Sequence, residues 1–275
     1  MVSNPEQVWG TSFSGLAARG VEVYDEVMVP RMFEPWARLL VDRLAVVAGE
    51  AVLDVACGPG SVTRILAAHV GATGHVTGCD LSAPMLALAR SKPAVAGHGT
   101  IDYHEAPADR LPVPDGSYDA VTCQQGLQFF PDRPAALREM RRALRPGGRV
   151  GIVVWAPIQN SPPFKALADG VEEIAGAELA QRYRNGPFGL TDAGELHGLV
   201  THAGFKDVRI SQAKLPVSFE GPAQVVATLA VTPLATEIAQ LPAVDREQLV
   251  AAVARRTGHE PINSQLEANI ALARR

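Results

Sequence analysis

The sequence predicts an α/β fold in which helices flank a doubly wound, mostly parallel sheet of seven strands. Short apolar runs alternate with helical patterns along residues 45–155, as in parallel strands joined by crossover helices. Two glycines one residue apart, Gly58 and Gly60, directly follow the first apolar run. An acid, Asp80, ends the second run 20 residues after Gly60. This spacing is typical of a strand–helix–strand unit that binds a ribose.

Residues with known preferences mark the element boundaries in the core. Ser82 and Asp132 stand directly before helical patterns, where their side chains cap a first turn. Gly71 and Gly74 end the first core helix. The predicted core strands are residues 51–56, 75–80, 101–105, 118–123 and 149–155, and the predicted core helices are residues 61–69, a segment from Ser82, and residues 134–144.

The regions on either side of the core have a different pattern. Residues 1–50 read as helical, with breaks at Pro30 and Pro35. After residue 155 the regular alternation ends. There we expect helices over 165–180, 192–203 (capped by Thr191), 222–240 and 245–256, a loop over 183–188, and strands over 208–213 and 267–274.

We expect a single domain over residues 1–275. Its core comprises about 45–155 with 190–220 and 265–275. Residues 1–44 form an N-terminal helical cap, and two lid insertions cover about 156–190 and 220–260.

Composition narrows the function classes. The 275 residues carry a net charge of −4 and no basic run, so neither nucleic acid nor a membrane is an expected partner. No apolar stretch is long enough to span a bilayer, and the N-terminus lacks a signal-peptide pattern, so we expect a cytoplasmic protein. The 3 cysteines lack metal-site spacing, so we expect buried thiols and no metal. The sequence does not predict an oligomeric state.

The strand ends carry the polar residues of a Rossmann-like cofactor site. Asp54 and the turn from Cys57 to Gly60 follow the first strand, and the next helix directs its positive end at this turn. Asp80 can accept hydrogen bonds from both ribose hydroxyls, although an ordinary helix cap is the alternative role. Thr63 replaces the third glycine of a dinucleotide site, which favours a mononucleoside ligand. Gln124 follows the fourth strand.

Four segments in order resemble class I S-adenosylmethionine-dependent methyltransferases, in the group of the ubiquinone/menaquinone-biosynthesis enzymes. They are residues 52–60, 78–82, 108–119 and 144–150, and the resemblance is strong over about 45–155. It implies S-adenosyl-L-methionine as the cofactor, a small-molecule substrate and an antiparallel closing strand.

The resemblance also implies roles for individual residues. Cys57, Gly58 and Gly60 would line the methionine end of the cofactor, with Asp54 near its amino group and Gln124 beneath it. Asp80 would bind the ribose, Leu81 and Met85 would flank the adenine, and Ala108 and Asp109 would face its edge. Two departures stand out: Pro107 replaces an adenine-contacting acid, and residues 127–130 lack a histidine pair that relatives often carry.

The N-terminal segment and the lids are expected to enclose the substrate. Tyr24, Phe33 and Trp36 are candidates to close over the sulfonium of the cofactor. For Phe33 and Trp36, packing in the core is the alternative. The lids carry apolar residues with few polar points, which predicts an apolar pocket. Arg31 and Arg184 are candidates to bind an acid, with solvation as the alternative for Arg184. The polar side chains expected in the lids are Tyr183, Arg184 and Asn185, and the apolar side chains are Phe164, Phe188, Leu229, Val231, Leu234 and Ile238.

The predicted function is methyl transfer to an oxygen, nitrogen or carbon atom of a small, moderately apolar metabolite. None of the 7 histidines stands where a base is needed, so the sequence identifies no catalytic residue. Three alternatives remain: a non-methylating reaction such as cyclisation or decarboxylation in the same cofactor pocket, an NAD-linked dehydrogenase, and a non-catalytic binding module.

Overall fold

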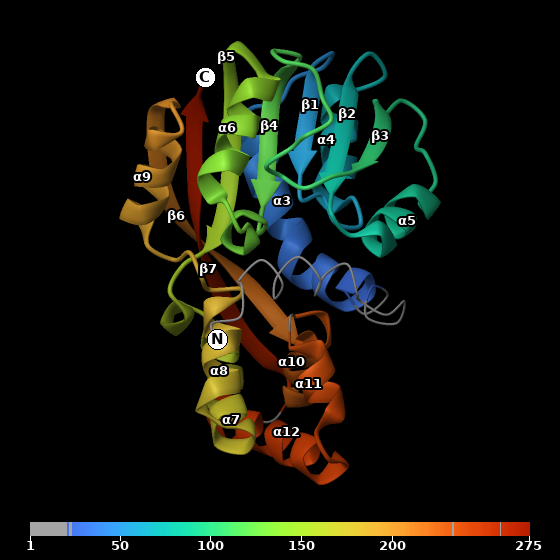
Figure 1. Cartoon of the computed structure of the whole chain (residues 1–275). Coiled ribbons are helices and arrows are strands. Elements are labelled where there is room, and N and C mark those ends of the chain that lie inside the picture. Colours follow the sequence, from blue (N-terminus) through green and yellow to red (C-terminus); the bar gives the residue numbers. More distant parts are fainter. Residues whose placement is uncertain (1–20, 22–23, 233, 259) are drawn as a thin grey trace.

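A seven-stranded sheet in the order β3-β2-β1-β4-β5-β7-β6 organises the chain (Figure 1). The computed structural model describes residues 21, 24–232, 234–258 and 260–275. Strands β1 to β5 are parallel, and β7 runs antiparallel between β5 and β6. The predicted sheet class is confirmed. The strands are β1 (Ala51–Val55), β2 (His75–Asp80), β3 (Thr100–Glu105), β4 (Tyr118–Gln124), β5 (Leu144–Trp155), β6 (Lys206–Phe219) and β7 (Ile262–Arg274).

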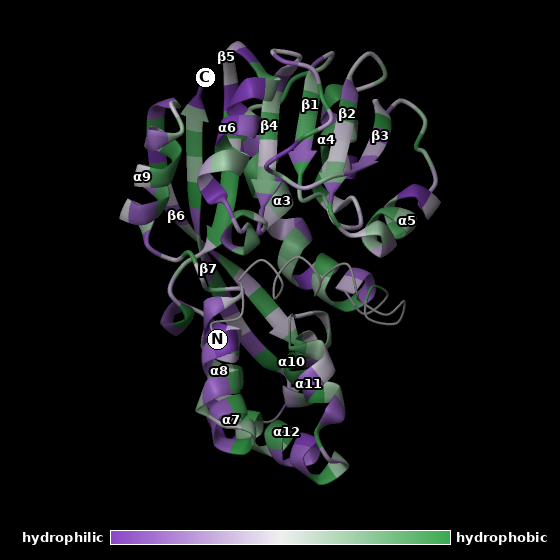
Figure 2. Cartoon of the chain, viewed as in Figure 1, coloured by the Kyte–Doolittle hydropathy of each residue, from purple (hydrophilic) through white to green (hydrophobic). Residues whose placement is uncertain are grey.

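Alternating side chains of the central strands bury both faces of the sheet. Leu53 of β1 points to a cluster with α6 (Arg133–Ala143) and α9 (Ala193–His202). Val52 points the other way, to a cluster with α3 (Glu34–Leu44) and α4 (Ser61–Val70). Each fully buried aliphatic side chain contributes about 1.5–3 kcal/mol. Hydrophobic residues accordingly run along the central strands (Figure 2).

Strands β6 and β7 are longer than the predicted 208–213 and 267–274. Their paired halves, from Lys214 to Phe219 and from Ile262 to Glu267, project beyond the other strands and carry the lid helices (Figure 1). Pro216 lies within this extension. Because proline lacks an N–H donor, it argues against a strand unless the strand lies at a sheet edge, as β6 does.

The first lid insertion contains two helices where the sequence predicted one over 165–180. α7 (Pro162–Ala175) and α8 (Ala177–Asn185) are divided at Gly176, which has φ 92°. α8 therefore takes up the first half of the predicted loop over 183–188. The next helix, α9, is capped by Asp192 and not by Thr191, since Asp192 Oδ1 accepts a hydrogen bond from Glu195 N at 2.7 Å.

The predicted helix over 222–240 is likewise interrupted. It consists of α10 (Pro222–Ala227), η4 (Thr228–Val231) and α11 (Ala235–Gln240), and α12 (Ala243–Thr257) follows. The hydroxyls of Thr228 and Thr232 donate to the carbonyls of Val225 and Leu229, at 2.6 and 2.8 Å. Such side-chain bonds compete with continuous helix.

The N-terminal segment approaches the sheet from the lid side. Residues Tyr24–Phe33 form η1, a π-helical turn that continues through Pro30, and Pro35 lies in the first turn of α3. The break predicted at Pro30 is therefore wrong, because the wider turn accommodates this proline. Next to Pro35 the π-helix does give way to a new α-helix, whose first turn tolerates the proline. The rest of the core consists of α5 (Ala83–Ser91) and the 3-10 turns η2 (Leu127–Phe129) and η3 (Ile158–Asn160).

The helical prediction for residues 1–20 lies outside the described residues. None of the described helices is both long and apolar enough to cross a bilayer.

Candidate functional site

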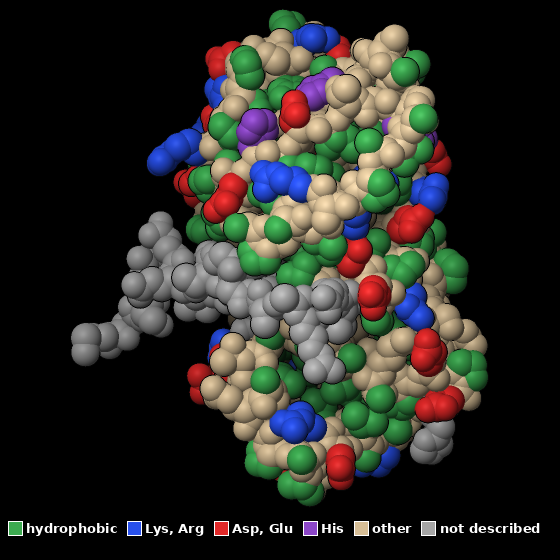
Figure 3. Space-filling model, turned by 90° about the vertical axis from the view of Figure 1, so that its right-hand side faces the viewer, with side chains coloured by type: hydrophobic (Ala, Val, Ile, Leu, Met, Phe, Trp, Pro, Cys, Tyr) green, Lys and Arg blue, Asp and Glu red, His purple; other side chains and the backbone are tan. Residues whose placement is uncertain are grey.

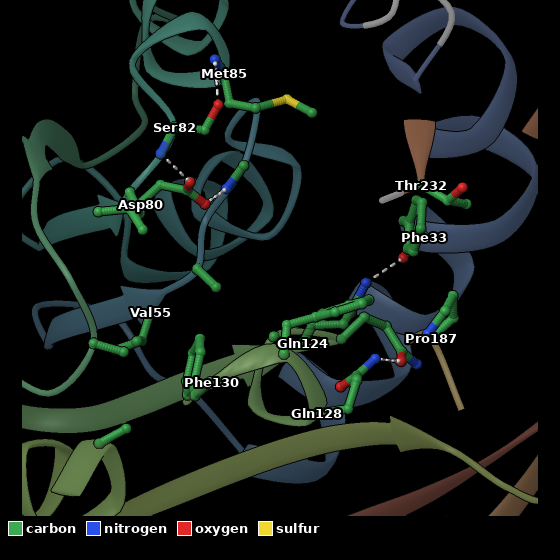
Figure 4. Close-up of a pocket in the computed structure, with 18 of the residues that line it drawn as sticks. Phe33, Val55, Asp80, Ser82, Met85, Gln124, Gln128, Phe130, Pro187 and Thr232 are labelled. Carbon is green, nitrogen blue, oxygen red and sulfur yellow. Dashed lines mark hydrogen bonds between the residues drawn. The ribbon is translucent and has the colours of Figure 1, made fainter. Parts of the chain in front are cut away.

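A cavity of about 280 Å³ lies between the carboxyl ends of the strands and the lid helices. It opens at the ends of β1 and β4, where the order of the strands reverses: β2 and β3 lie on one side of β1, and β4 and β5 lie on the other. Open α/β sheets bind ligands at this point. We call the part around Gly58, Asp80 and Met85 the glycine-turn end. The part around Gln128 and Pro187, across the cavity, is the lid end (Figure 4).

The glycine-turn end is built around a half-buried carboxylate, that of Asp80. Gly58 N and Ser82 N donate to the two oxygens of Asp80, each at 2.8 Å. Burial raises the pKa of Asp80, and these two amides oppose that shift. Gly58 has φ 53°, and a Cβ there would have no atom within 4 Å. Glycine at this position provides the left-handed turn and leaves open space beside the carboxylate.

Gly60 has a different role from Gly58. A Cβ on Gly60 would collide with the hydroxyl of Tyr103, and its φ is 80°. Gly78 in β2 also makes room for this ring, because a Cβ there would lie 2.7 Å from Tyr103 Cδ1. Gly60 therefore allows the turn to pack on Tyr103 and does not line the cavity.

Asp54 lies beneath the turn and outside the cavity lining. It is 1% exposed and accepts hydrogen bonds from the hydroxyls of Thr63, at 2.7 Å, and Thr122, at 2.8 Å. Burial raises its pKa to about 6, although both hydroxyls oppose the shift. The position where a dinucleotide site has its third glycine thus holds a threonine that binds this acid. Cys57 is also buried outside the lining, with its amide bonded to the carbonyl of Cys79.

An apolar surface adjoins Asp80 on the side of α5. Ser82 Oγ accepts a hydrogen bond from Met85 N, which fixes the start of α5, and the Met85 side chain is buried against the cavity. Leu81 is 43% exposed at the same edge. Ala108 and Asp109 face the cavity from the loop after β3.

The N-terminal segment η1 forms the opposite wall. Tyr24 stacks on Phe33 with ring centroids 4.9 Å apart, and both line the cavity. Gln124 Nε2 donates to the Phe33 carbonyl at 2.9 Å, while Gln124 Oε1 is buried without a hydrogen-bond partner. Trp36 instead packs edge-on against Trp155 in the core, so the packing alternative applies to it.

An ion pair connects η1 to the glycine turn. Lys92 Nζ lies 2.6 Å from Asp25 Oδ1 and also donates to the Pro59 carbonyl at 3.0 Å. Both side chains are about four-fifths buried, which strengthens the pair relative to a solvent-exposed one. Arg31 pairs with Glu220 at the end of β6, and Arg184 pairs with acids of α7. Neither arginine lines the cavity.

The predicted residues divide into two groups. Those that line the cavity are Tyr24, Phe33, Gly58, Asp80, Leu81, Met85, Ala108, Asp109 and Gln124, and those that do not are Asp54, Cys57 and Gly60. Of the lid positions, Phe164, Tyr183 and Phe188 line the cavity, while Leu229, Leu234 and Ile238 pack into the core behind it.

Sequence reasoning missed several lining residues, including Met28, Met32, Gln125, Gln128 and Thr232. Gln125 was detectable as a polar residue placed directly after an apolar strand, whereas Gln128 lies further on, inside η2. The two methionines give no signal that separates them from core residues. None of the histidines in the described part of the chain lines the cavity, and the described residues include no group of three His, Cys, Asp or Glu suited to a metal ion.

The sheet order, the turn at Gly58 and the amide-bound acid ending β2 define the Rossmann-like methyltransferase class. A profile of the ubiE/COQ5 methyltransferase family matches residues 4–217, and the chain belongs to that family. The family prediction is confirmed, and with it S-adenosyl-L-methionine as the cofactor.

One relative is the ubiquinone/menaquinone biosynthesis C-methyltransferase UbiE of Hahella chejuensis, which is 36% identical over 155 residues. That match covers 56% of this chain and 62% of the relative's length, so the chain spans less than two thirds of that protein.

Two solved structures share the fold. Phosphoethanolamine N-methyltransferase 2 of Haemonchus contortus is 18% identical with a TM-score of 0.58, covering 94% of this chain and 57% of that one. The [4+2]-cyclase SpnF is 24% identical with a TM-score of 0.54, covering 88% and 81%.

Proposed function

We propose that this chain is a methyltransferase that uses S-adenosyl-L-methionine to methylate an oxygen, nitrogen or carbon atom of a small, moderately apolar metabolite. The observation that carries the proposal is the half-buried Asp80 carboxylate, held by two backbone amides at one end of a cavity whose other end is largely apolar. The ubiE/COQ5 family match favours this reaction over the NAD-linked alternative.

The residues of the glycine-turn end fit the proposed cofactor. Asp80 keeps lone pairs free for ribose hydroxyls beyond its two amide bonds. Leu81 and Met85 offer apolar contact to an adenine, and the open space at Gly58 suits the amino-acid part. The unpartnered Oε1 of Gln124 suits an ammonium group.

Asp54, Cys57 and Gly60 support the turn from behind in this proposal. Asp109 at the cavity edge, or the Ala108 backbone alone, would contact the adenine.

The protein's part in the reaction is to bind, orient and exclude water. When bound, the cofactor supplies a methyl group on a positively charged sulfur. Stacked Tyr24 and Phe33 form a wall whose ring faces can contact such a charge. The lids bring Phe164 and Phe188 over the cavity, which keeps solvent from an acceptor held in line.

No catalytic base is assigned. Burial raises the pKa of Tyr183, the tyrosine at the lid end, so its side chain stays a protonated phenol that cannot take a proton from the substrate. A cytoplasmic location stays a prediction, supported by 3 free, buried cysteines.

Calorimetry with S-adenosylhomocysteine and with NADH tests the cofactor. We expect the first ligand to bind and the second to give no heat; binding of NADH alone would overturn the proposal. Incubation with methyl-labelled cofactor and candidate acceptors then tests the reaction. Products that form without label would favour the non-methylating alternative.

A further inference from the structure

Gln125 and Gln128 place paired amides at the lid end of the cavity. Gln128 Nε2 donates to Gln125 Oε1 at 3.0 Å. This leaves Gln125 Nε2 and Gln128 Oε1 buried without a hydrogen-bond partner. The side chains are 9% and 4% exposed, and both line the cavity. Buried polar groups are nearly always paired, so these atoms indicate a ligand that completes them.

The backbone supplies a second, independent observation. Gln125 has φ 54°, a left-handed conformation that glycine adopts without strain and a side chain with a Cβ does not. The turn is fixed from both sides: Gln125 N donates to the Val153 carbonyl at 2.8 Å, and a Cβ on Gly126 would lie 2.6 Å from Ala56 Cβ. A strained residue at a ligand site is typical of a position kept for its side chain.

The pair always presents one free donor and one free acceptor. If both side-chain amides rotate by half a turn, their oxygen and nitrogen atoms exchange places. The hydrogen bond between them then reverses, and the free atoms become Gln125 Oε1 and Gln128 Nε2. A hydroxyl group matches this arrangement because it donates one hydrogen bond and accepts another. A carboxylate would face the free acceptor, and an ammonium would face the free donor.

The surroundings also favour a neutral group. The charged side chains among the described lining residues are Asp80, Asp109 and Asp132. Asp80 lies across the cavity from Gln128 (Figure 4). The lid end is lined by aromatic and aliphatic side chains such as Phe130, Phe164 and Pro187. Asp132 is exposed, and its carboxylate caps α6 by accepting a hydrogen bond from Ala135 N. A charged group moved to the lid end would lose its hydration without a buried opposite charge to replace it.

We propose that Gln125 and Gln128 bind the methyl acceptor through an uncharged hydroxyl group carried on an apolar ring or chain. This inference rests on the proposed function, because it takes the lid end as the acceptor site. The two glutamines would orient the acceptor, and they would discriminate against amines and acids of the same shape.

Four probes with one ring system test the inference: 1-naphthol, naphthalene, 1-naphthoate and 1-naphthylmethylamine. Their affinities are measured by calorimetry on the full chain saturated with S-adenosylhomocysteine. We expect 1-naphthol to bind about tenfold more tightly than naphthalene, since naphthalene leaves the amides unpaired, and both charged probes to bind more weakly still.

Two variants test whether the preference for 1-naphthol over naphthalene comes from Gln125 and Gln128. Gln125→Gly relieves the strained backbone and removes one amide, and Gln128→Met keeps the side-chain length without polar atoms. In both, the preference for 1-naphthol over naphthalene should fall below about twofold, while S-adenosylhomocysteine affinity stays within about twofold. The melting temperature of Gln125→Gly should equal or exceed that of the parent chain, whereas a purely structural glutamine would lower it.

Gln181→Met is the matched control. It removes an amide that donates to Asn185 at 2.8 Å on the exposed surface of α8, and it should leave the preference unchanged.

Equal binding of 1-naphthol and naphthalene, tighter binding of a charged probe, a preference that survives in both variants, or no binding of any probe to the S-adenosylhomocysteine complex would each overturn the inference. Failure of S-adenosylhomocysteine itself to bind would instead overturn the proposed function.

Discussion

The two ends of the cavity are held in place by different means. At the glycine-turn end, the polar side chain Asp80 is fixed by backbone amides of two adjacent strand ends. At the lid end, side chains from η2, α7, α8 and η4 meet through apolar contacts, and the two glutamine amides bond to each other. The first end is determined by the parallel sheet. At the second end, the glutamine pair also follows a strand of that sheet, β4, but the apolar wall around it comes from helices that pack on the projecting halves of β6 and β7 (Figure 1). The proposed cofactor contacts thus belong to the sheet, whereas most of the wall around the proposed acceptor is added to it.

One face of the outer surface carries charges of both signs without a visible separation between the two ends. Lys and Arg side chains are interspersed with Asp and Glu over the face shown in Figure 3. This distribution, with the net charge of −4, favours a ligand that is recognised inside the cavity.

Removing the carboxylate at the glycine-turn end should have the largest effect. In Asp80→Asn the new amide places an N–H against the N–H of Gly58 or Ser82, and the charge is lost. Hydrogen bonds to charged groups contribute about 1.5–3 kcal/mol, so we expect S-adenosylhomocysteine to bind roughly 100-fold more weakly by calorimetry.

Asp102→Asn is the control for this variant, because it neutralises an exposed acid on β3 away from the cavity. An affinity in Asp80→Asn within threefold of the parent chain would contradict the comparison between the two ends.

The support beneath the glycine turn should have the next largest effect. Thr63→Val deprives buried Asp54 of one of its two hydroxyl donors while keeping the side-chain shape. We expect a loss of about 2 kcal/mol in the free energy of unfolding at pH 8, measured with urea, and a much smaller loss in Thr63→Ser. Equal losses in the two variants would show that the hydroxyl is not responsible.

The Thr63→Val penalty should also depend on pH. The pKa of Asp54 is raised by burial to about 6, above its ordinary value of 3.8. The folded state therefore holds the proton more tightly, so this group favours folding below pH 3.8 and loses that contribution as the pH rises through about 6. Only the ionised acid needs both hydroxyls strongly, so the penalty should be smaller at pH 4.5 than at pH 8. A penalty independent of pH would contradict this assignment.

The ion pair between η1 and the glycine turn should have a moderate effect. Lys92→Met removes both the bond to Asp25 and the bond to the Pro59 carbonyl. We expect S-adenosylhomocysteine to dissociate about three- to tenfold faster in stopped-flow measurements, because the wall formed by Tyr24 and Phe33 loses this anchor. Arg38→Met breaks an exposed pair with Glu34 and serves as the control, with no expected change.

The difference between the two ends also explains what the sequence can predict. Gly58 and Asp80 were predictable because a tight turn and a strand-terminal acid leave local signals at a fixed spacing. The role of Gly60, which packs on Tyr103 and does not line the cavity, was not predictable, because it depends on a side chain from β3. Gln125 was visible as a polar residue after a strand, but its pairing with Gln128 requires the turn geometry.

The lid end shows the same limit more strongly. Thr228 and Thr232 interrupt a helix that periodicity alone predicts as continuous. Gly176 divides another predicted helix into α7 and α8. In the sequence, a glycine at this position is compatible with one continuous helix as well as with two. These residue types also occur inside continuous helices, so their presence in the sequence does not decide where a helix is interrupted.

The smallest effect is expected at the edge of the glycine-turn end. Asp109 lines the cavity, but its side chain is exposed, so water competes with any hydrogen bond that it makes to an adenine. Asp109→Asn should weaken S-adenosylhomocysteine binding by less than about threefold in calorimetry, whereas Asp80→Asn weakens it greatly. A loss above tenfold in Asp109→Asn would assign the adenine contact to this carboxylate and extend the polar part of the site to the loop after β3. A change within threefold leaves the Ala108 backbone as the polar contact and keeps backbone-fixed groups as the basis of cofactor binding.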